Sequence, residues 1–190
     1  MLVVPVYNMV LAPDSTVFFP LSLLQRSAGD RNIAVQEKVI LIVARENENF
    51  TDMNETSFYP IGVAGIITEL NQQGFAVIKT QYRVDVEAVS IDPDHTLKLT
   101  ISRRNDLDDL DSVVEAEKLK NLLQEMRAFS AGFQWAESAE FYLNQIDSIG
   151  MAACVLSPWL KISNEERYAI LCPADNGYNS YCRRCLRLPA

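Results

Sequence analysis

Two cysteines near the end of the sequence have a spacing that could support metal or redox chemistry. Cys182 and Cys185 form a Cys-x-x-Cys pair, the spacing found in zinc sites and in thiol–disulfide exchange. Structural zinc normally takes four ligands from two such pairs, and a redox pair is expected between a strand and a helix. This pair stands alone, so we expect neither a metal nor a redox function for it.

The histidine of the chain lies in a second group of reactive residues. His95 ends the sequence Asp92-Pro-Asp-His95, where two carboxylates and an imidazole could bind a metal ion, or the histidine could act as the base of a catalytic triad. The same residue types are typical of an exposed polar turn, which is a poor place to orient a base. We interpret the segment as a turn and keep a small hydrolase that uses His95 as an alternative.

Other common signatures of catalysis are missing from the sequence. It contains no phosphate-binding loop of the form G-x-x-x-x-G-K-[ST] and no G-x-S-x-G nucleophile elbow. None of its carboxylates forms an evident acid–base pair. The residues therefore predict a binding module without an active site, a metal or a cofactor.

Composition and charge narrow the class of protein further. The 190 residues are 48% hydrophobic and carry a net charge of -8, which predicts a folded core and repulsion of nucleic-acid phosphates. No basic residue precedes Arg26 and polar residues interrupt the first apolar ones, so a secretory signal is not expected. No apolar window is long enough for a membrane helix. We expect a cytoplasmic protein with neither nucleic acid nor membrane as a partner.

The first hundred residues are predicted to be rich in short strands, which lie at residues 3–7, 39–43, 61–67, 75–78, 82–86 and 97–101. The continuous β-branched run at 39–43 is typical of a strand that is covered on both faces. Asn71-Gln-Gln-Gly74 predicts a hairpin turn, while Gly62 and Gly65 predict a bulge or a close backbone approach. Short strands at this spacing predict a small, strongly bent sheet or barrel.

The pattern changes to a helical period after residue 111. Apolar residues recur there at three- and four-residue steps: Leu119, Leu122, Leu123, Met126, Phe129 and Phe133. Ser112 with Glu115, and Ser163 with Glu166, have the spacing of capping boxes. We expect helices from Ser112 to about Gly132, over 136–149 and 151–160, and from Ser163 to about 171, besides a short helix over 30–38 with Asp30 as its N-cap.

These patterns predict an α+β fold in three parts. Residues 1–105 form a β-rich subdomain, residues 112–171 form a helical bundle, and residues 172–190 form an irregular tail. The tail contains Pro173 and Asn176-Gly177 but no helical or strand period. It is either a flexible tail or the product of a change in reading frame.

Several segments, taken in order, resemble the N-terminal domain of Lon proteases. Residues 4–21 are similar to its opening, with Ala12 and Asp14 departing from the pattern, and residues 31–35 and 39–44 to its next helix and strand. Tyr59-Pro-Ile-Gly62-Val-Ala64 is similar to a later segment. A further family pattern, G-x-x-R, is partly present, with Thr80 in place of the glycine and Arg83 three residues later. Residues 156–167 resemble the L-P-L-x-x-E-E-x-Q region of that family, so the resemblance covers about residues 1–171.

The resemblance implies a PUA-like β pseudo-barrel that is followed by a C-terminal helical bundle. In Lon this unit helps to recognise unfolded or tagged protein substrates and contributes to hexamer assembly. The ATPase and Ser-Lys peptidase modules lie downstream of it, so we do not expect this chain to be an enzyme. It would be a substrate-recognition domain of an ATP-dependent protease or a stand-alone relative. A PUA-like RNA-binding module is the alternative, which the acidic charge disfavours.

The resemblance also suggests which residues contact a bound polypeptide: Phe18, Phe19, Phe58, Tyr59 and Arg83. Successive strand residues point to opposite faces, so one of Phe18 and Phe19 should enter the core. The other is then a candidate for cover by the helices or for contact with an unfolded chain. For Arg83 the competing interpretation is a structural ion pair or a bond to a carbonyl group.

Overall fold

The computed structural model describes residues 1–46, 52–92, 96–104, 112–132, 136, 140, 143–156 and 161–171. The strands are β1 (Leu2–Val6), β2 (Thr16–Pro20), β3 (Lys38–Ala44), β4 (Phe58–Leu70), β5 (Phe75–Ile91) and β6 (Leu97–Arg103). The helices are α1 (Leu21–Ala28), α2 (Ser112–Ser130), α4 (Ile149–Leu156) and α5 (Asn164–Leu171), with a short 3₁₀ turn η1 (Glu55–Ser57) before β4.

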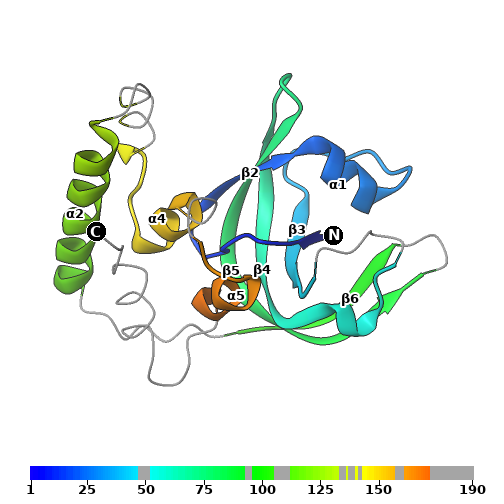
Figure 1. The fold of residues 1–190 in the computed structure, drawn as a ribbon. Coiled ribbons are helices and arrows are strands. Elements are labelled where there is room, and N and C mark those ends of the chain that lie inside the picture. The colour runs from blue at the N-terminus through cyan, green and yellow to red at the C-terminus, as the bar shows by residue number, and fades with distance from the viewer. Residues whose placement is uncertain are drawn as a thin grey trace.

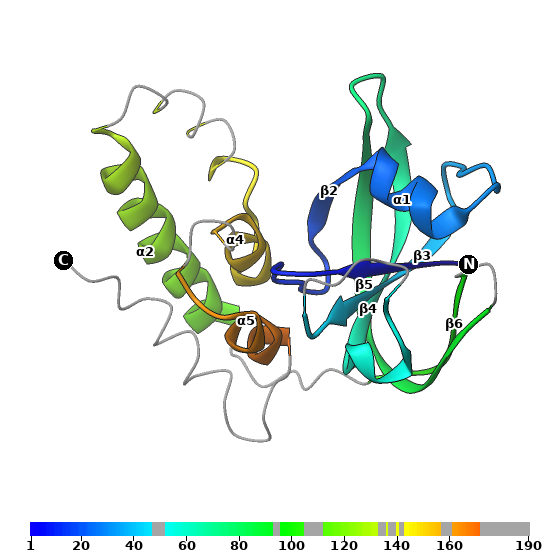
Figure 2. The same ribbon diagram turned by 45° about the vertical axis from the view of Figure 1, so that its right-hand side comes forward.

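The strands form one mixed sheet in the order β1-β3-β4-β5-β2, with β6 added to β5. The β1–β3 pair is parallel and the other pairs are antiparallel. Helices α2, α4 and α5 follow the sheet in the chain and lie to one side of it, whereas α1 lies beside the β4–β5 hairpin (Figure 1, Figure 2). This confirms the predicted α+β class, while closure of the sheet into a PUA-like pseudo-barrel stays a prediction.

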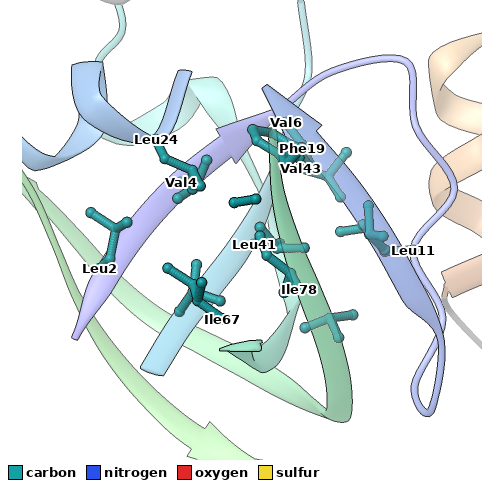
Figure 3. Packing of buried hydrophobic residues seen from close by; sticks show 14 of the residues in the cluster. Leu2, Val4, Val6, Leu11, Phe19, Leu24, Leu41, Val43, Ile67 and Ile78 are labelled. Carbon is teal, nitrogen blue, oxygen red and sulfur yellow. The ribbon is translucent and has the colours of Figure 1, made fainter. Parts of the chain in front are cut away.

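The core lies on both faces of β3. Side chains from β1, β3, β4 and β5 converge on one face with Phe19, Leu11 and Leu24 (Figure 3). On the opposite face Ile40 and Ile42 contact the second half of β5 and β6, because the long β5 bends back across the sheet. The prediction that this β-branched run is covered on both faces is confirmed.

Close backbone contacts explain the two glycines of β4. A Cβ atom on Gly62 would lie 2.7 Å from the Leu41 carbonyl oxygen, and one on Gly65 would lie 2.8 Å from the Lys79 carbonyl oxygen. The β4–β5 register also shifts between Ala64 and Gly65, as expected for a bulge. Both features that the sequence predicted at these glycines are therefore present.

The predicted hairpin is present, but its second strand is longer than expected. Asn71 Oδ1 accepts hydrogen bonds from the backbone N–H groups of Gln73 (3.1 Å) and Phe75 (2.9 Å). From Phe75 the chain continues as a single 17-residue strand instead of the two that the sequence predicted. The polar residue Thr80 does not interrupt it, because its buried hydroxyl donates to carbonyl groups of the loop before β2.

The helix predicted over residues 30–38 is wrong, and the segment is not helical. Gln36 has a φ of 70° and donates its N–H to the Ile67 carbonyl (2.7 Å), while the Ile67 N–H donates to the Glu37 carbonyl (3.0 Å). The segment is therefore bonded to β4. The helix lies earlier, at α1, where Leu24, Ser27 and Ala28 are buried at helical spacing.

The long helix α2 packs through one face against the segment that follows it. Leu119, Leu122, Leu123 and Met126 contact a small cluster of Leu143, Ile146 and Ala152, as the period predicted. Phe129 was predicted on the same face but is 65% exposed. The last residue of α2 that packs against the cluster is Met126, so Phe129, three residues later, lies beyond the end of the cluster. Phe133 lies outside the described residues.

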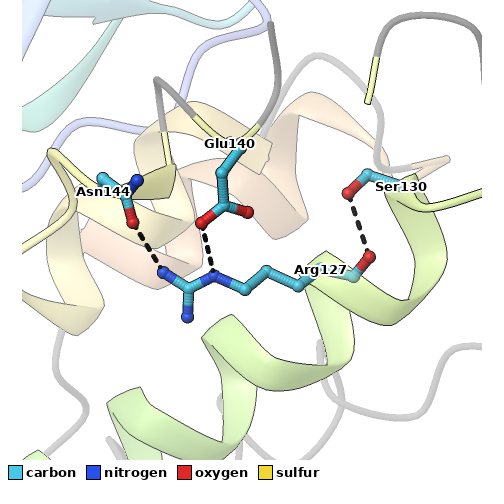
Figure 4. A network of polar contacts seen from close by, with 4 residues as sticks. All are labelled: Arg127, Ser130, Glu140 and Asn144. Atoms are coloured by element: carbon cyan, nitrogen blue, oxygen red, sulfur yellow. Dashed lines mark hydrogen bonds and ion pairs between the residues drawn. The ribbon is translucent and has the colours of Figure 1, made fainter. Parts of the chain in front are cut away.

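Polar contacts join the end of α2 to the residues after it. Arg127 donates to Glu140 Oε1 (3.1 Å) and to Asn144 Oδ1 (2.9 Å), and the Ser130 hydroxyl donates to the Arg127 carbonyl (3.1 Å) (Figure 4). The Arg127–Glu140 pair is solvent-exposed, so it adds little to stability.

The next two helices differ from the sequence prediction at their junction. The predicted helix over 136–149 ends earlier, because residues 144–148 form a turn, and α4 begins at Ile149 instead of residue 151. The Ser148 hydroxyl accepts from the Met151 N–H (3.2 Å), which makes Ser148 a cap that the sequence analysis missed.

The capping box of the last helix is confirmed. The Ser163 N–H donates to Glu166 Oε2 (2.8 Å), and the Glu166 N–H donates to the Ser163 hydroxyl (3.2 Å). The side chain of Ser112, which was predicted to cap α2, lies outside the described residues. In the part of the chain that the structure describes, no helix is long and apolar enough to cross a membrane.

Candidate functional site

The residues singled out for catalysis and metal binding are only partly described. Asp92 pairs with Lys98 at 2.6 Å at the end of the β5–β6 hairpin. Asp94, His95, Cys182 and Cys185 lie outside the described residues. Among those that are described, no group of three or more His, Cys, Asp and Glu side chains could hold a metal ion.

The structure does not gather the five predicted polypeptide contacts on one surface. Phe19 is 3% exposed and packs in the main core, and Phe58 and Arg83 are buried too. Phe18 is 53% exposed, so the prediction that one of the two neighbouring phenylalanines enters the core is confirmed. Tyr59 is half-buried. Without a rearrangement, a chain in solution can therefore touch Phe18 and part of Tyr59.

Tyr59 takes part in the docking of α5 on the sheet. Its ring stacks on Tyr168 of α5, with ring centroids 3.9 Å apart and planes 15° apart. The Arg45 guanidinium also lies over the Tyr59 ring, 4.5 Å from its centroid. Such stacked and cation–π contacts stabilise the packed state, so much of the Tyr59 ring is already used inside this fold.

Asn164 completes the same docking through polar contacts. Its Nδ2 donates to the carbonyl groups of Ala44 (2.8 Å) and Arg45 (3.2 Å), and its Oδ1 accepts from the Asn8 N–H (2.9 Å). Asn8 Oδ1 in turn accepts from Arg167 at 2.5 Å. Asn8 has a φ of 58°, a left-handed conformation that asparagine tolerates better than most residues. The last turn of α5 then places Leu171 in the main core.

A set of exposed apolar side chains lies on the outer face of the β2–β5 ladder. Phe18 pairs with Val77, and Pro20 pairs with Phe75, which is 42% exposed. Directly paired residues share a face of the sheet, as do residues two apart along a strand. These four residues therefore form one apolar strip, which we call the outer strip. Val77 and Pro20 are half-buried.

Of the four residues of the outer strip, only Phe18 was predicted from the sequence as a contact residue. Phe75 and Val77 were assigned to a strand but not to a contact surface, and Pro20 was noted only as part of a motif. The turn Asn71–Gly74 could have indicated that Phe75 and Val77 share a face of the sheet, because a hairpin turn fixes the alternation of faces along β5.

Helix α4 meets the sheet at the loop before β2. A Cβ atom on Gly150 would lie 2.9 Å from the Ala12 Cβ, so only glycine permits this approach. Burial raises the pKa of the Cys154 thiol to about 11, although its hydrogen bonds to the Ser15 side chain and the Ala12 backbone act in the opposite direction. At neutral pH this thiol is protonated and a poor nucleophile.

The described features define a bent mixed sheet with appended helices and an exposed aromatic strip. Its fold is that of the N-terminal domains of Lon proteases. The N-terminal domain of the Lon protease from the Mycobacterium avium complex matches 92% of this chain over 90% of its own length, with a TM-score of 0.50 and 16% identity. The Lon N-terminal domain protein from Xanthomonas campestris matches 98% of the chain over 96% of its length, with a TM-score of 0.51 and 16% identity.

The likeness is one of fold. No protein-family model matches the sequence, and no curated protein matches it. The resemblance that the motifs indicated is nonetheless confirmed at the level of structure.

Proposed function

We propose that this chain is a non-catalytic module that binds unfolded or tagged polypeptides, as the substrate-recognition domain of a Lon-type protease or as a stand-alone relative in the cytoplasm. The fold likeness to Lon N-terminal domains supports the class of module. The observation that carries the binding role is the outer strip, where two aromatic side chains, Phe18 and Phe75, are exposed at diagonal positions on one face of the sheet. Unfolded chains expose apolar side chains that such a strip can cover.

The outer strip also makes the role specific to unfolded partners. Folded proteins bury most of their large apolar residues, so they offer few side chains to Phe18 and Phe75. The net charge of -8 repels nucleic acids, which favours a polypeptide over an RNA as the partner. Self-association, as in a hexameric parent protein, would be compatible with this role.

Isothermal titration with a reduced, carboxymethylated protein tests the proposal, with the native form of the same protein as the control partner. We expect binding of the unfolded form only, and an affinity that falls about tenfold, near 1.4 kcal/mol, in Phe18→Ser/Phe75→Ser. Val35→Ser is a matched control, because Val35 is an exposed apolar residue outside the strip. Absence of binding by the folded wild-type chain at high concentration would contradict the proposal. A salt-dependent gel shift with RNA would favour the alternative, an RNA-binding module.

A further inference from the structure

Two backbone hydrogen bonds fix which residues of β2 face its neighbour β5. The Leu21 N–H donates to the Gly74 carbonyl (2.8 Å), and the Thr80 N–H donates to the Ser15 carbonyl (2.9 Å). Both pairs continue the β2–β5 register at its two ends. In an antiparallel ladder, hydrogen-bonded and non-hydrogen-bonded pairs alternate. The odd-numbered positions between them therefore bond to β5, and the even-numbered positions do not.

Thr16 and Phe18 consequently direct their N–H and C=O groups away from β5. Strand β2 ends the strand order, and none of the hydrogen bonds of the described residues involves these outward groups. Their side chains lie on the outer face, since Val17 and Phe19 point into the core. The exposed phenyl ring of Phe18 and an open row of backbone donors and acceptors thus occur at the same place.

The opposite end of the strand order differs. Both α1 and β6 contact β1. Helix α1 also contacts β2, but it does so where the chain leaves β2, because α1 begins at the next residue, Leu21. Edge strands are usually shielded by a helix, by charge or by proline. Among the described residues, the one such device on β2 is Pro20, at the last position of the strand.

A positive charge lies beside this edge. Lys79 pairs with Thr16, so its side chain is on the same outer face as Phe18. It is exposed, and it forms no ion pair with any described residue. The outer face thus offers an apolar surface at Phe18 and Phe75 and a cation at the Thr16 end. Its exposed carboxylate residue, Glu69, pairs with Val77 from β4 and lies farther from the β2 edge. A complementary partner carries an apolar side chain with an acidic side chain two residues away.

We propose that the edge of β2 binds an extended segment of an unfolded polypeptide as an added strand, with an apolar side chain on Phe18 and an acidic one near Lys79. This inference rests on the proposed function and specifies its mode of contact. Main-chain hydrogen bonds give affinity for any extended backbone, and alternate side chains give selectivity. Only an unfolded segment has its backbone groups free for this pairing, because a folded chain has already paired its own.

Backbone methylation of a peptide tests the added strand on the wild-type protein. The probe is a short labelled peptide that contains Glu-Val-Phe between threonines, and its binding is measured by fluorescence anisotropy. Two versions carry N-methyl groups on alternate amides, one version for each side of the peptide strand. We expect one version to lose binding by at least about tenfold and the other to bind like the parent, since only one side of an added strand bonds to β2.

Three protein variants separate the backbone and charge contributions. Phe18→Pro removes the ring and the outward N–H, whereas Phe18→Ala removes the ring alone, so the first should bind the peptide several-fold more weakly than the second. Lys79→Glu should weaken the glutamate peptide and strengthen a version with lysine in place of glutamate. Circular dichroism of each variant verifies the fold.

The outcomes distinguish this inference from the proposed function. If both methylated versions bind equally, the added strand is overturned, while binding of unfolded protein through the outer strip stands. If unfolded protein binds Phe18→Pro as well as it binds Phe18→Ala, and Lys79→Glu leaves its affinity unchanged, the β2 edge is likewise excluded. If neither the peptide nor the unfolded protein binds the wild-type chain, both proposals fail together.

Discussion

The sheet and the helices that follow it are packed very differently. The largest fully buried side chains belong to the sheet and its loops, with Leu24 of α1 and Leu171 of α5 as the exceptions, whereas none lies among the described residues of α2. The cluster beneath α2 has three buried members, and the α2 side chains around it are half-buried. The difference teaches that the sheet, with α5 docked on it, holds most of the hydrophobic stabilisation, and that α2 is supported mainly through one face.

A matched pair of leucines should show this difference most strongly. Leu41→Ala removes a fully buried side chain at the centre of β3 and should lower the free energy of unfolding by roughly 3–5 kcal/mol. Leu122→Ala removes a half-buried side chain of α2 and should cost about 1 kcal/mol. Urea unfolding followed by circular dichroism measures both. Equal losses would contradict the contrast between the two regions.

Two asparagines test whether α5 belongs energetically to the sheet. Asn164→Ala removes three hydrogen bonds that join α5 to Asn8, Ala44 and Arg45, and leaves buried groups unpaired, so we expect a loss of about 2–3 kcal/mol. Asn144→Ala is the control, because Asn144 is exposed and bonds to Arg127; it should change stability by less than about 0.5 kcal/mol. A small loss of unfolding free energy in Asn164→Ala would show that α5 adds little to the stability of the sheet.

Two glycines compare the tolerance of the same regions to one added methyl group. Gly65→Ala brings a Cβ atom within 2.8 Å of the Lys79 carbonyl oxygen in the β4–β5 pair and should cost roughly 1–3 kcal/mol. Gly132, after α2, has no atom within 4 Å of such a Cβ. Gly132→Ala should be neutral or stabilise by up to about 1 kcal/mol. Thermal unfolding of the two variants provides the measurement, and a neutral Gly65→Ala would show that the strands can separate locally.

The smallest effect concerns the junction between the two regions. The Cys154 thiol has its pKa raised by burial from 9.0 to about 11, so the folded state keeps the proton longer than the unfolded state does. Stability is therefore unaffected below pH 9 and falls as the pH rises from 9 toward 11. Between pH 8 and pH 10 we expect wild type to lose roughly 1–2 kcal/mol more stability than Cys154→Ala does. Parallel stability curves for the two proteins from pH 8 to 10 would show that the thiol is open to solvent.

Local patterns in the sequence were sufficient for many elements of the fold. The β-branched run of β3, the hairpin turn at Asn71–Gly74 and the Ser163–Glu166 capping box each depend on residues close in the chain. The misplaced helix at 30–38 shows the limit of this reasoning. Bonds from Gln36 and Glu37 to the distant Ile67 outweighed the local helix signal, and no short-range pattern contains those partners.

The candidate site shows the same division at the level of single residues. That one of Phe18 and Phe19 would be buried followed from strand alternation alone. Tertiary structure selected Phe19, because the register with β5 and the packing of β3 decide which face of β2 meets the core. Tertiary structure likewise placed Phe75 diagonally across from Phe18 on one face and stacked Tyr168 of α5 on Tyr59. It also left the outward backbone groups of Thr16 and Phe18 without a hydrogen bond to any described residue. The sequence by itself determined many of the elements and the alternation of faces along the strands, whereas pairing between distant strands decided which side chains reach the surface.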